Sequence, residues 1–422
     1  MCQWHMFSTD RSGAETWECV ARSNPQAQTL QAMKGMKTLR SGRNRRKWIY
    51  VLLLMGLLGL SGCGSPSSAS VEMSSQTELV KTGSMELQYA ENFAVDYYED
   101  GYKMLTTLPD SKQYLLVPEG QPVPRGLDED VSILQEPLQN IYLVASGVMD
   151  MFASVDAVDQ IRFSGQKQEN WYIQTAKDAM AAGDMIYAGK YSKPDYELLV
   201  SEGCDLAIEN RMITHSPEVV EMLQSFDIPV MIEYSSYEQH PLGKVEWVKF
   251  FGALTGKEAE AEEAFAEQTE ILEKVESGEK TGKTIAFFYV TSNGLIQVRQ
   301  STDYIPKLIE LAGGRYIFED LEDSGSGRST LNMQVEDFYA GARDADILIY
   351  NSSIDGGVTT LDELIGKCNI LKDFKAVQEG QVYCTTNDMY QQSMAIGYLL
   401  QDMHTVLTDD DTAKLRYLFL LQ

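Results

Sequence analysis

Short apolar runs alternate with helical patterns along this chain, in two rounds that are separated by one long helical stretch. The apolar runs of the first round are residues 141–144, 185–187, 205–208 and 229–232, and those of the second are 284–290, 295–298, 346–350 and 382–384. Strands that alternate with helices at the spacing of the first round are typical of a parallel sheet covered on both faces. We therefore predict an α/β fold with two Rossmann-like lobes, at residues 85–243 and 278–422.

Residues 244–277 connect the two rounds. Their apolar side chains recur at helical intervals, as in Val245, Val248, Phe251 and Leu254. One unbroken helix over this stretch would be roughly 50 Å long. We expect such a helix to span both lobes, with Gly252 and Gly256 as its weakest positions. Two lobes joined in this way place the functional site in the cleft between them.

The N-terminal part has the pattern of a secretory signal peptide. A basic cluster at residues 40–47 precedes thirteen apolar residues at 48–60. This apolar run is too short for a membrane-spanning helix, which needs about twenty residues. The next residues, Leu60-Ser61-Gly62-Cys63, resemble a bacterial lipobox, which implies that Cys63 becomes the lipid-modified first residue of the mature protein. Several acyl chains on Cys63 would anchor the protein to the membrane outside the cytoplasm.

Residues 1–35 are polar and do not belong to such a signal. We expect translation to begin at Met33 or Met36, with a genuine N-terminal extension as the alternative. Residues 1–62 are thus assigned to the signal peptide. Residues 63–84 begin with a Ser-rich stretch and are interpreted as a flexible tether.

Charge and cysteine content limit the possible functions. The chain from residue 63 onward carries a net charge of −33 over 360 residues, which argues against nucleic-acid binding because phosphates would repel it. Its remaining cysteines, Cys204, Cys368 and Cys384, are odd in number and have no C-x-x-C spacing. We expect buried thiols rather than a disulfide framework.

The sequence contains no convincing catalytic or metal-binding motif. Residues 278–284 are one residue short of a phosphate-binding loop and precede a strand, so we interpret them as a helix stop and turn. His215, His240 and His404 are too few and too scattered for a metal site, and His240 is expected to be a turn histidine bound to the backbone. We therefore predict a binding protein rather than an enzyme, with no cofactor of its own.

Polar and aromatic side chains follow the predicted strands at their carboxyl ends, where ligands bind in open α/β sheets. Tyrosines and arginines beside hydroxyls and amides suit a bulky, partly anionic ligand, because rings pack on its apolar parts and guanidinium groups hold its carboxylates. The residues predicted to contact ligand are Tyr191, Ser236, Tyr237, Arg299, Arg328 and Asn351.

Several segments resemble the ABC-transporter substrate-binding lipoproteins of the ferric-siderophore, haem and cobalamin class. The segments are residues 189–208, with Pro194-Asp-Tyr-Glu197, then 227–230, 307–314, 344–349 and 374–383. Their order and spacing carry the resemblance, which extends from about residue 141 to the C-terminus, whereas residues 85–138 match only loosely.

The resemblance implies a monomeric two-lobed receptor that delivers an iron complex or a corrinoid to a membrane permease driven by ATP hydrolysis. It also implies that one glutamate on each lobe, Glu197 and Glu336 here, meets arginines of the permease. The alternatives are a receptor for bare Zn²⁺ or Mn²⁺, a secreted enzyme with its site in the interlobe cleft, and a surface adhesin. The Zn²⁺ or Mn²⁺ alternative would need three or four converging histidine and carboxylate ligands.

Overall fold

The computed structural model describes residues 3–9, 15–20, 79–321, 329–352, 357–410 and 412–422. The chain forms two units, Met1–Ser74 and Ser75–Gln422. In the first unit, β1 (Gln3–Thr9) pairs antiparallel with β2 (Glu15–Val20). The predicted lipidation site Cys63 and the predicted ligand residue Arg328 lie outside the described residues. Within the described ranges, no helix is long and apolar enough to cross a membrane.

The first lobe contains the predicted parallel sheet. Its strand order is β10-β9-β8-β13-β14, and all four neighbouring pairs are parallel. The strands are β8 (Ile141–Leu143), β9 (Ile161–Ser164), β10 (Ile186–Tyr187), β13 (Leu206–Asn210) and β14 (Val230–Glu233). The helices are α2 (Val148–Ser154), α3 (Gln174–Ala182), α4 (Tyr196–Ser201) and α5 (Pro217–Ser225).

Alternate residues of β13 face different hydrophobic cores, as expected for a strand covered on both faces. Leu206 and Ile208 belong to the core that includes residues of α2 and α3. Ala207 belongs to a separate core with residues of α4 and α5. The prediction of helices on both faces of this sheet is confirmed.

The second lobe has a mixed sheet with strand order β18-β16-β15-β19-β20-β21, and β17 pairs with β15. Its strands are β15 (Thr284–Val290), β16 (Ile296–Arg299), β17 (Arg315–Tyr316), β18 (Thr330–Met333), β19 (Ile347–Tyr350), β20 (Val382–Thr385) and β21 (Leu418–Leu420). The short connection from β15 to β16 allows only an antiparallel pair. The helices are α8 (Tyr304–Leu311), α9 (Val335–Ala342), α10 (Leu361–Lys367), α11 (Lys375–Glu379) and α12 (Ile396–Thr408).

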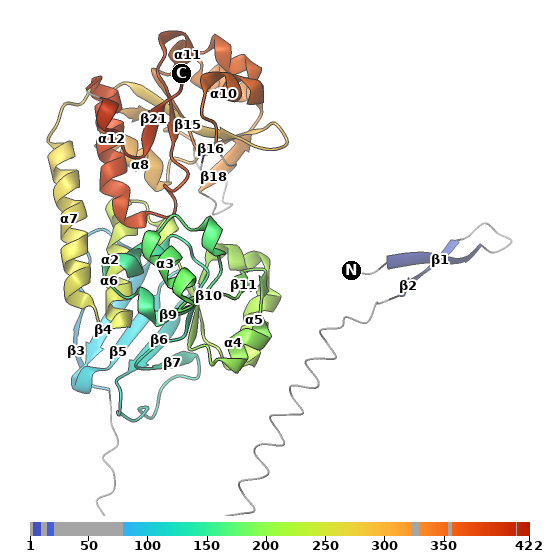
Figure 1. Cartoon of the computed structure of the whole chain (residues 1–422), viewed down its shortest axis with the longest axis vertical. Helices are drawn as coiled ribbons and strands as arrows, with labels where there is room; N and C mark the ends of the chain where they lie inside the picture. Colours follow the sequence, from blue (N-terminus) through green and yellow to red (C-terminus); the bar gives the residue numbers. More distant parts are fainter. Residues whose placement is uncertain (1–2, 10–14, 21–78, 322–328, 353–356, 411) are drawn as a thin grey trace, which may run out of the picture. The chain divides into compact units, whose positions relative to one another are not determined.

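The connecting segment is not one helix, so the prediction of an unbroken helix over residues 244–277 is wrong. It forms α6 (Pro241–Thr255) and α7 (Glu258–Glu276), which pack against each other. Gly256 ends α6 with φ of 71°, a left-handed conformation that glycine adopts without strain. The spanning role falls to α7, which contacts α2 of the first lobe and both α8 and α12 of the second (Figure 1).

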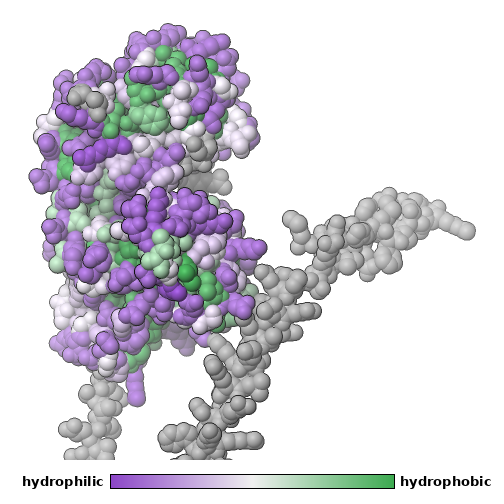
Figure 2. Space-filling view, in the orientation of Figure 1, coloured by the Kyte–Doolittle hydropathy of each residue, from purple (hydrophilic) through white to green (hydrophobic). Residues whose placement is uncertain are grey.

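Residues 81–135 form an additional sheet, β3-β4-β5-β6-β7. Its strands are β3 (Lys81–Ser84), β4 (Phe93–Tyr98), β5 (Lys103–Thr107), β6 (Lys112–Val117) and β7 (Val131–Gln135). Strand β3 lies at the end of the predicted tether, and β4–β7 lie in residues that the sequence assigned to the first lobe without specifying their fold. The sheet packs on α6, where the Phe93 ring lies 4.9 Å from the Trp247 ring and 5.3 Å from the Phe250 ring between centroids. Hydrophilic residues cover most of the visible face of residues 79–422, in keeping with the high charge (Figure 2).

Candidate ligand site between the lobes

A pocket of about 240 Å³ lies where three strands of the first lobe end. Its lining comes from the residues after β8, β13 and β14, from α6, and from the loop that precedes α12. The lining residues are Ala145, Ser146, Gly147, Asn210, Arg211, Met212, Glu233, Ser235, Ser236, Tyr237, Lys244, Tyr390 and Ser393. Two predicted ligand residues, Ser236 and Tyr237, therefore lie in one pocket.

The loop of Ser235–Tyr237, which we call the ligand loop, is held by the preceding glutamate. The Glu233 carboxylate accepts hydrogen bonds from the backbone N–H of Ser235 at 2.8 Å and from its hydroxyl at 2.6 Å. Tyr237 remains 38% exposed, and the Arg211 guanidinium lies 4.6 Å from the centre of its ring. The loop thus presents an aromatic face and a neighbouring cation to the pocket.

Lys244 is a buried cation in the same pocket, and sequence reasoning missed it. The side chain is 4% exposed, and its ammonium lies 4.7 Å from the centre of the Tyr304 ring. Burial lowers the pKa of Lys244, while the nearby Glu233 carboxylate opposes that shift. Burial likewise raises the pKa of Glu233, which its hydrogen bonds from Ser235 oppose. The pocket therefore contains two basic side chains, Lys244 and Arg211, and one carboxylate, Glu233, which is hydrogen-bonded to Ser235.

Arg299 and Asn351 do not line this pocket. Both contact Tyr390, which does. The Arg299 guanidinium is buried, pairs with the Asp303 carboxylate at 3.3 Å and donates to the Tyr390 hydroxyl. The Asn351 amide donates to the same hydroxyl at 2.6 Å. Burial raises the pKa of Tyr390 to about 12, so this phenol stays protonated at neutral pH. Asp303 also caps α8 by accepting from the N–H of Ile305.

The other predicted residues are placed elsewhere. Tyr191 lies in the turn between β11 (Gly189–Lys190) and β12 (Lys193–Pro194), packs against the core under α4 and α5, and does not line the pocket. Glu197 and Glu336 are exposed in the first turns of α4 and α9.

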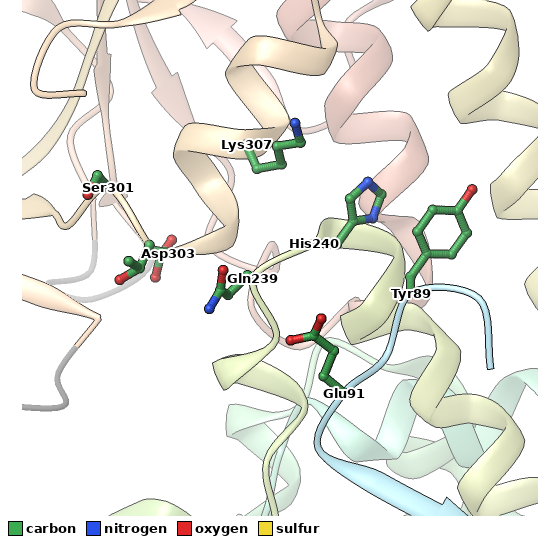
Figure 3. A pocket seen from close by; sticks show the side chains of 8 residues that line it. Tyr89, Glu91, Gln239, His240, Ser301, Asp303 and Lys307 are labelled. Atoms are coloured by element: carbon green, nitrogen blue, oxygen red, sulfur yellow. The ribbon is translucent and has the colours of Figure 1, made fainter. Parts of the chain in front are cut away.

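A second pocket, of about 360 Å³, is lined by three separate segments (Figure 3). Its residues are Tyr89, Glu91, Gln239, His240, Ser301, Thr302, Asp303 and Lys307. The His240 ring caps α6 by accepting from the N–H of Leu242 at 3.1 Å, which confirms the prediction of a backbone-bound histidine. The same ring stacks on Tyr89 with 4.4 Å between centroids. Among the described residues, no three His, Cys, Asp or Glu side chains are grouped to hold a metal ion.

The sequence model of the periplasmic binding protein family matches residues 144–389. The chain belongs to this family. The predicted resemblance is thereby confirmed. Two uncharacterized lipoproteins of Methanocaldococcus jannaschii are also similar, at 24% identity over 85% of this chain and 92% of the relative, and at 23% over 82% and 90%.

Solved structures of periplasmic binding proteins share the fold. A possible iron-binding solute-binding protein from Staphylococcus epidermidis has a TM-score of 0.50 at 17% identity, over 64% of this chain and 98% of that one. The haem-binding protein of Vibrio cholerae has a TM-score of 0.51 at 14% identity, over 63% and 98%. A periplasmic binding protein of Veillonella parvula has a TM-score of 0.51 at 15% identity, over 78% and 98%. The family match begins at residue 144, after the sheet β3–β7.

Proposed function

We propose that this protein is an extracytoplasmic, lipid-anchored receptor that captures an iron complex (a siderophore or haem) or a corrinoid and delivers it to an ABC permease. The observation that carries this proposal is the pocket at the strand ends of the first lobe, lined by Arg211, Tyr237 and Lys244, in a periplasmic binding protein. Two structural neighbours, a possible iron-binding protein and a haem-binding protein, support the ligand class.

The chemistry of the pocket favours a ligand that carries anionic groups on an aromatic or flat body. Arg211 provides positive charge, Lys244 provides an ammonium donor beside the Glu233 carboxylate, and the rings of Tyr237 and Tyr390 provide flat apolar surface. The pocket, at about 240 Å³, is smaller than the range of about 300–1,000 Å³ that drug-sized ligands occupy. A whole iron complex would therefore enter only after the lobes separate.

Anchoring and permease docking belong to the same proposal. Cys63 would carry the lipid, and Glu197 and Glu336 would bind the permease. The exposure of both glutamates at the start of a helix supports the docking role, because each carboxylate is available to a partner. A purely local role, in which each glutamate complements a helix N-terminus, would stabilise the protein by about 0.3–1 kcal/mol.

The experiment that tests the ligand class begins with the full-length protein in detergent. The absorbance spectrum and mass of any co-purified molecule are recorded first, since haem, corrinoids and ferric siderophores all absorb visible light. Haemin, ferric catecholate and hydroxamate chelates, cyanocobalamin, Zn²⁺ and Mn²⁺ are then titrated against tryptophan fluorescence. Saturable binding of one of the complexes supports the proposal, whereas saturable binding of Zn²⁺ or Mn²⁺ alone would overturn it.

A further inference from the structure

Two buried carboxylates, Glu238 and Glu246, bind five consecutive residues of the chain before β4. We call these residues, 88–92, the N-terminal segment. The Glu246 carboxylate of α6, which is 0% exposed, accepts from the backbone N–H groups of Gln88 at 2.9 and 3.1 Å, Tyr89 at 2.8 Å and Ala90 at 2.9 Å. The Glu238 carboxylate, 2% exposed, accepts from the N–H groups of Glu91 at 2.9 Å and Asn92 at 3.0 Å. Each backbone donor of the segment is therefore used.

Glu238 directly follows Tyr237, the last residue of the ligand loop. Its carboxylate also accepts from the indole N–H of Trp247 at 2.9 Å. Trp247 is fully buried against Phe93 of β4. Glu238 thus joins three parts of the molecule: the ligand loop, helix α6 and the N-terminal segment.

The N-terminal segment also contacts His240, two residues after Glu238. The Tyr89 ring stacks on His240, which caps α6 (Figure 3). A buried carboxylate needs hydrogen bonds around it, and bonds to an ionised group are roughly twice as strong as neutral ones. Residues 238–240 are therefore held firmly against a part of the chain that precedes the family match at residue 144.

We propose that the N-terminal segment positions the ligand loop, with Glu238 as the positioning residue through which it acts. Among the described residues, the backbone N–H groups of the segment donate to Glu238 and Glu246, so the segment fixes the residue that follows Ser236 and Tyr237. This inference rests on the proposed function, because it takes the pocket beside the ligand loop as the ligand site. The geometry of the ligand loop then depends on a segment that lies outside the matched family region.

Glu238→Gln and Glu246→Gln form a matched pair of variants. Both place an amide N–H₂ where backbone N–H groups now donate, so both lose hydrogen bonds to the same segment. Only Glu238 adjoins the ligand loop; Glu246 lies in the middle of α6 and outside the pocket. Each full-length variant is examined by hydrogen exchange of residues 233–240, by melting temperature and by titration with the complex that binds the wild type.

We expect both variants to lower the melting temperature by similar amounts. Only Glu238→Gln should speed hydrogen exchange in residues 233–240, by about tenfold. It should also weaken the binding of the complex by about tenfold, whereas Glu246→Gln should not. Equal exchange and affinity in the two variants would show that Glu238 is only structural. If Glu238→Gln does not fold, Trp247→Phe removes one donor to Glu238 and keeps an aromatic ring, and it should give a smaller change of the same kind.

The exchange measurement needs no ligand, so the two proposals can fail separately. If no complex binds the wild type, the proposed function fails while the exchange comparison still decides whether the segment holds the loop. If the complex binds all variants equally and only exchange changes, the segment orders the loop without affecting the ligand, and the positioning role is wrong.

Discussion

Glu209 should make the stability of this protein fall as pH rises through neutrality. The residue lies in β13 and is fully buried, and neither carboxylate oxygen has a hydrogen-bond partner among the described residues. Burial raises the pKa of Glu209 from about 4.5 to about 8. The folded protein therefore keeps this acid protonated at neutral pH, whereas the unfolded chain ionises it.

The sign and size of the effect follow from linkage between protonation and folding. A pKa raised in the folded state gives stability that is fully present below about pH 4.5 and is lost between about pH 4.5 and 8. Each pH unit in this window corresponds to about 1.36 kcal/mol, so the loss at pH 7 is on the order of 3 kcal/mol. Glu209→Gln keeps the shape of the side chain and cannot ionise.

The assay is chemical denaturation of the wild type and of Glu209→Gln from pH 5 to pH 8. The buried amide of the variant has its own cost, which does not change with pH, so only the slope is diagnostic. We expect the variant to gain about 3 kcal/mol relative to the wild type between pH 5 and pH 8. The exposed Glu218→Gln in α5 serves as the control. A difference between Glu209→Gln and wild type that stays constant with pH would refute the protonated state.

Three further predictions concern the proposed function. Cys63→Ser should leave the protein unprocessed or released from membranes, and unchanged diacylglycerol labelling would contradict the anchor. Lys244→Met and Arg211→Ala should each weaken the bound complex by roughly 10- to 150-fold, because each removes a charge-assisted contact of about 1.5–3 kcal/mol; wild-type affinity in both variants would mean that the ligand binds elsewhere. The double variant Glu197→Lys, Glu336→Lys should bind its ligand normally and abolish uptake in cells, and persistent uptake would exclude docking through these residues.

Strands β8, β10, β13 and β14 of the first lobe and β15, β16, β19 and β20 of the second were predictable, because each lies in a short apolar run between turns. Strands β9, β17, β18 and β21 were not predicted. Gly256 was identified as a weak position of the connecting helix, but one continuous helix was still predicted, since the helical spacing of apolar residues continues across Gly256 to Ala261 and Phe265, which are both buried. The spacing of apolar residues indicates which side chains are buried. It does not indicate where one helix ends and the next begins in another direction. The sheet β3–β7 was missed because several of its strands are partly exposed and carry polar residues, so their alternation is weak.

Two residues of the pocket were predicted from one general rule, that ligands bind at the carboxyl ends of parallel strands. Ser236 and Tyr237 follow β14 and line the pocket as that rule requires. Lys244 and Tyr390 come from a helix and a distant loop, which no local pattern brings together. Arg299 was expected to face the ligand, but the acid four residues later, Asp303, pairs with it and favours burial.

Helix α6 explains why the pocket could not be completed from sequence. Residues 241–254 of this helix are all buried, so it has no solvent face and no amphipathic pattern. Its charged residues contact different neighbours. Lys244 lines the pocket, and Glu246 binds the N-terminal segment. Lys249 pairs with Glu262 of α7 at 3.0 Å. Because a buried charge is tolerated only with a partner, each of these residues specifies which element packs on that side of α6. Three charged residues of α6 thus link the pocket, the N-terminal segment and the spanning helix, although the apolar pattern of the sequence gives no reason to bury them.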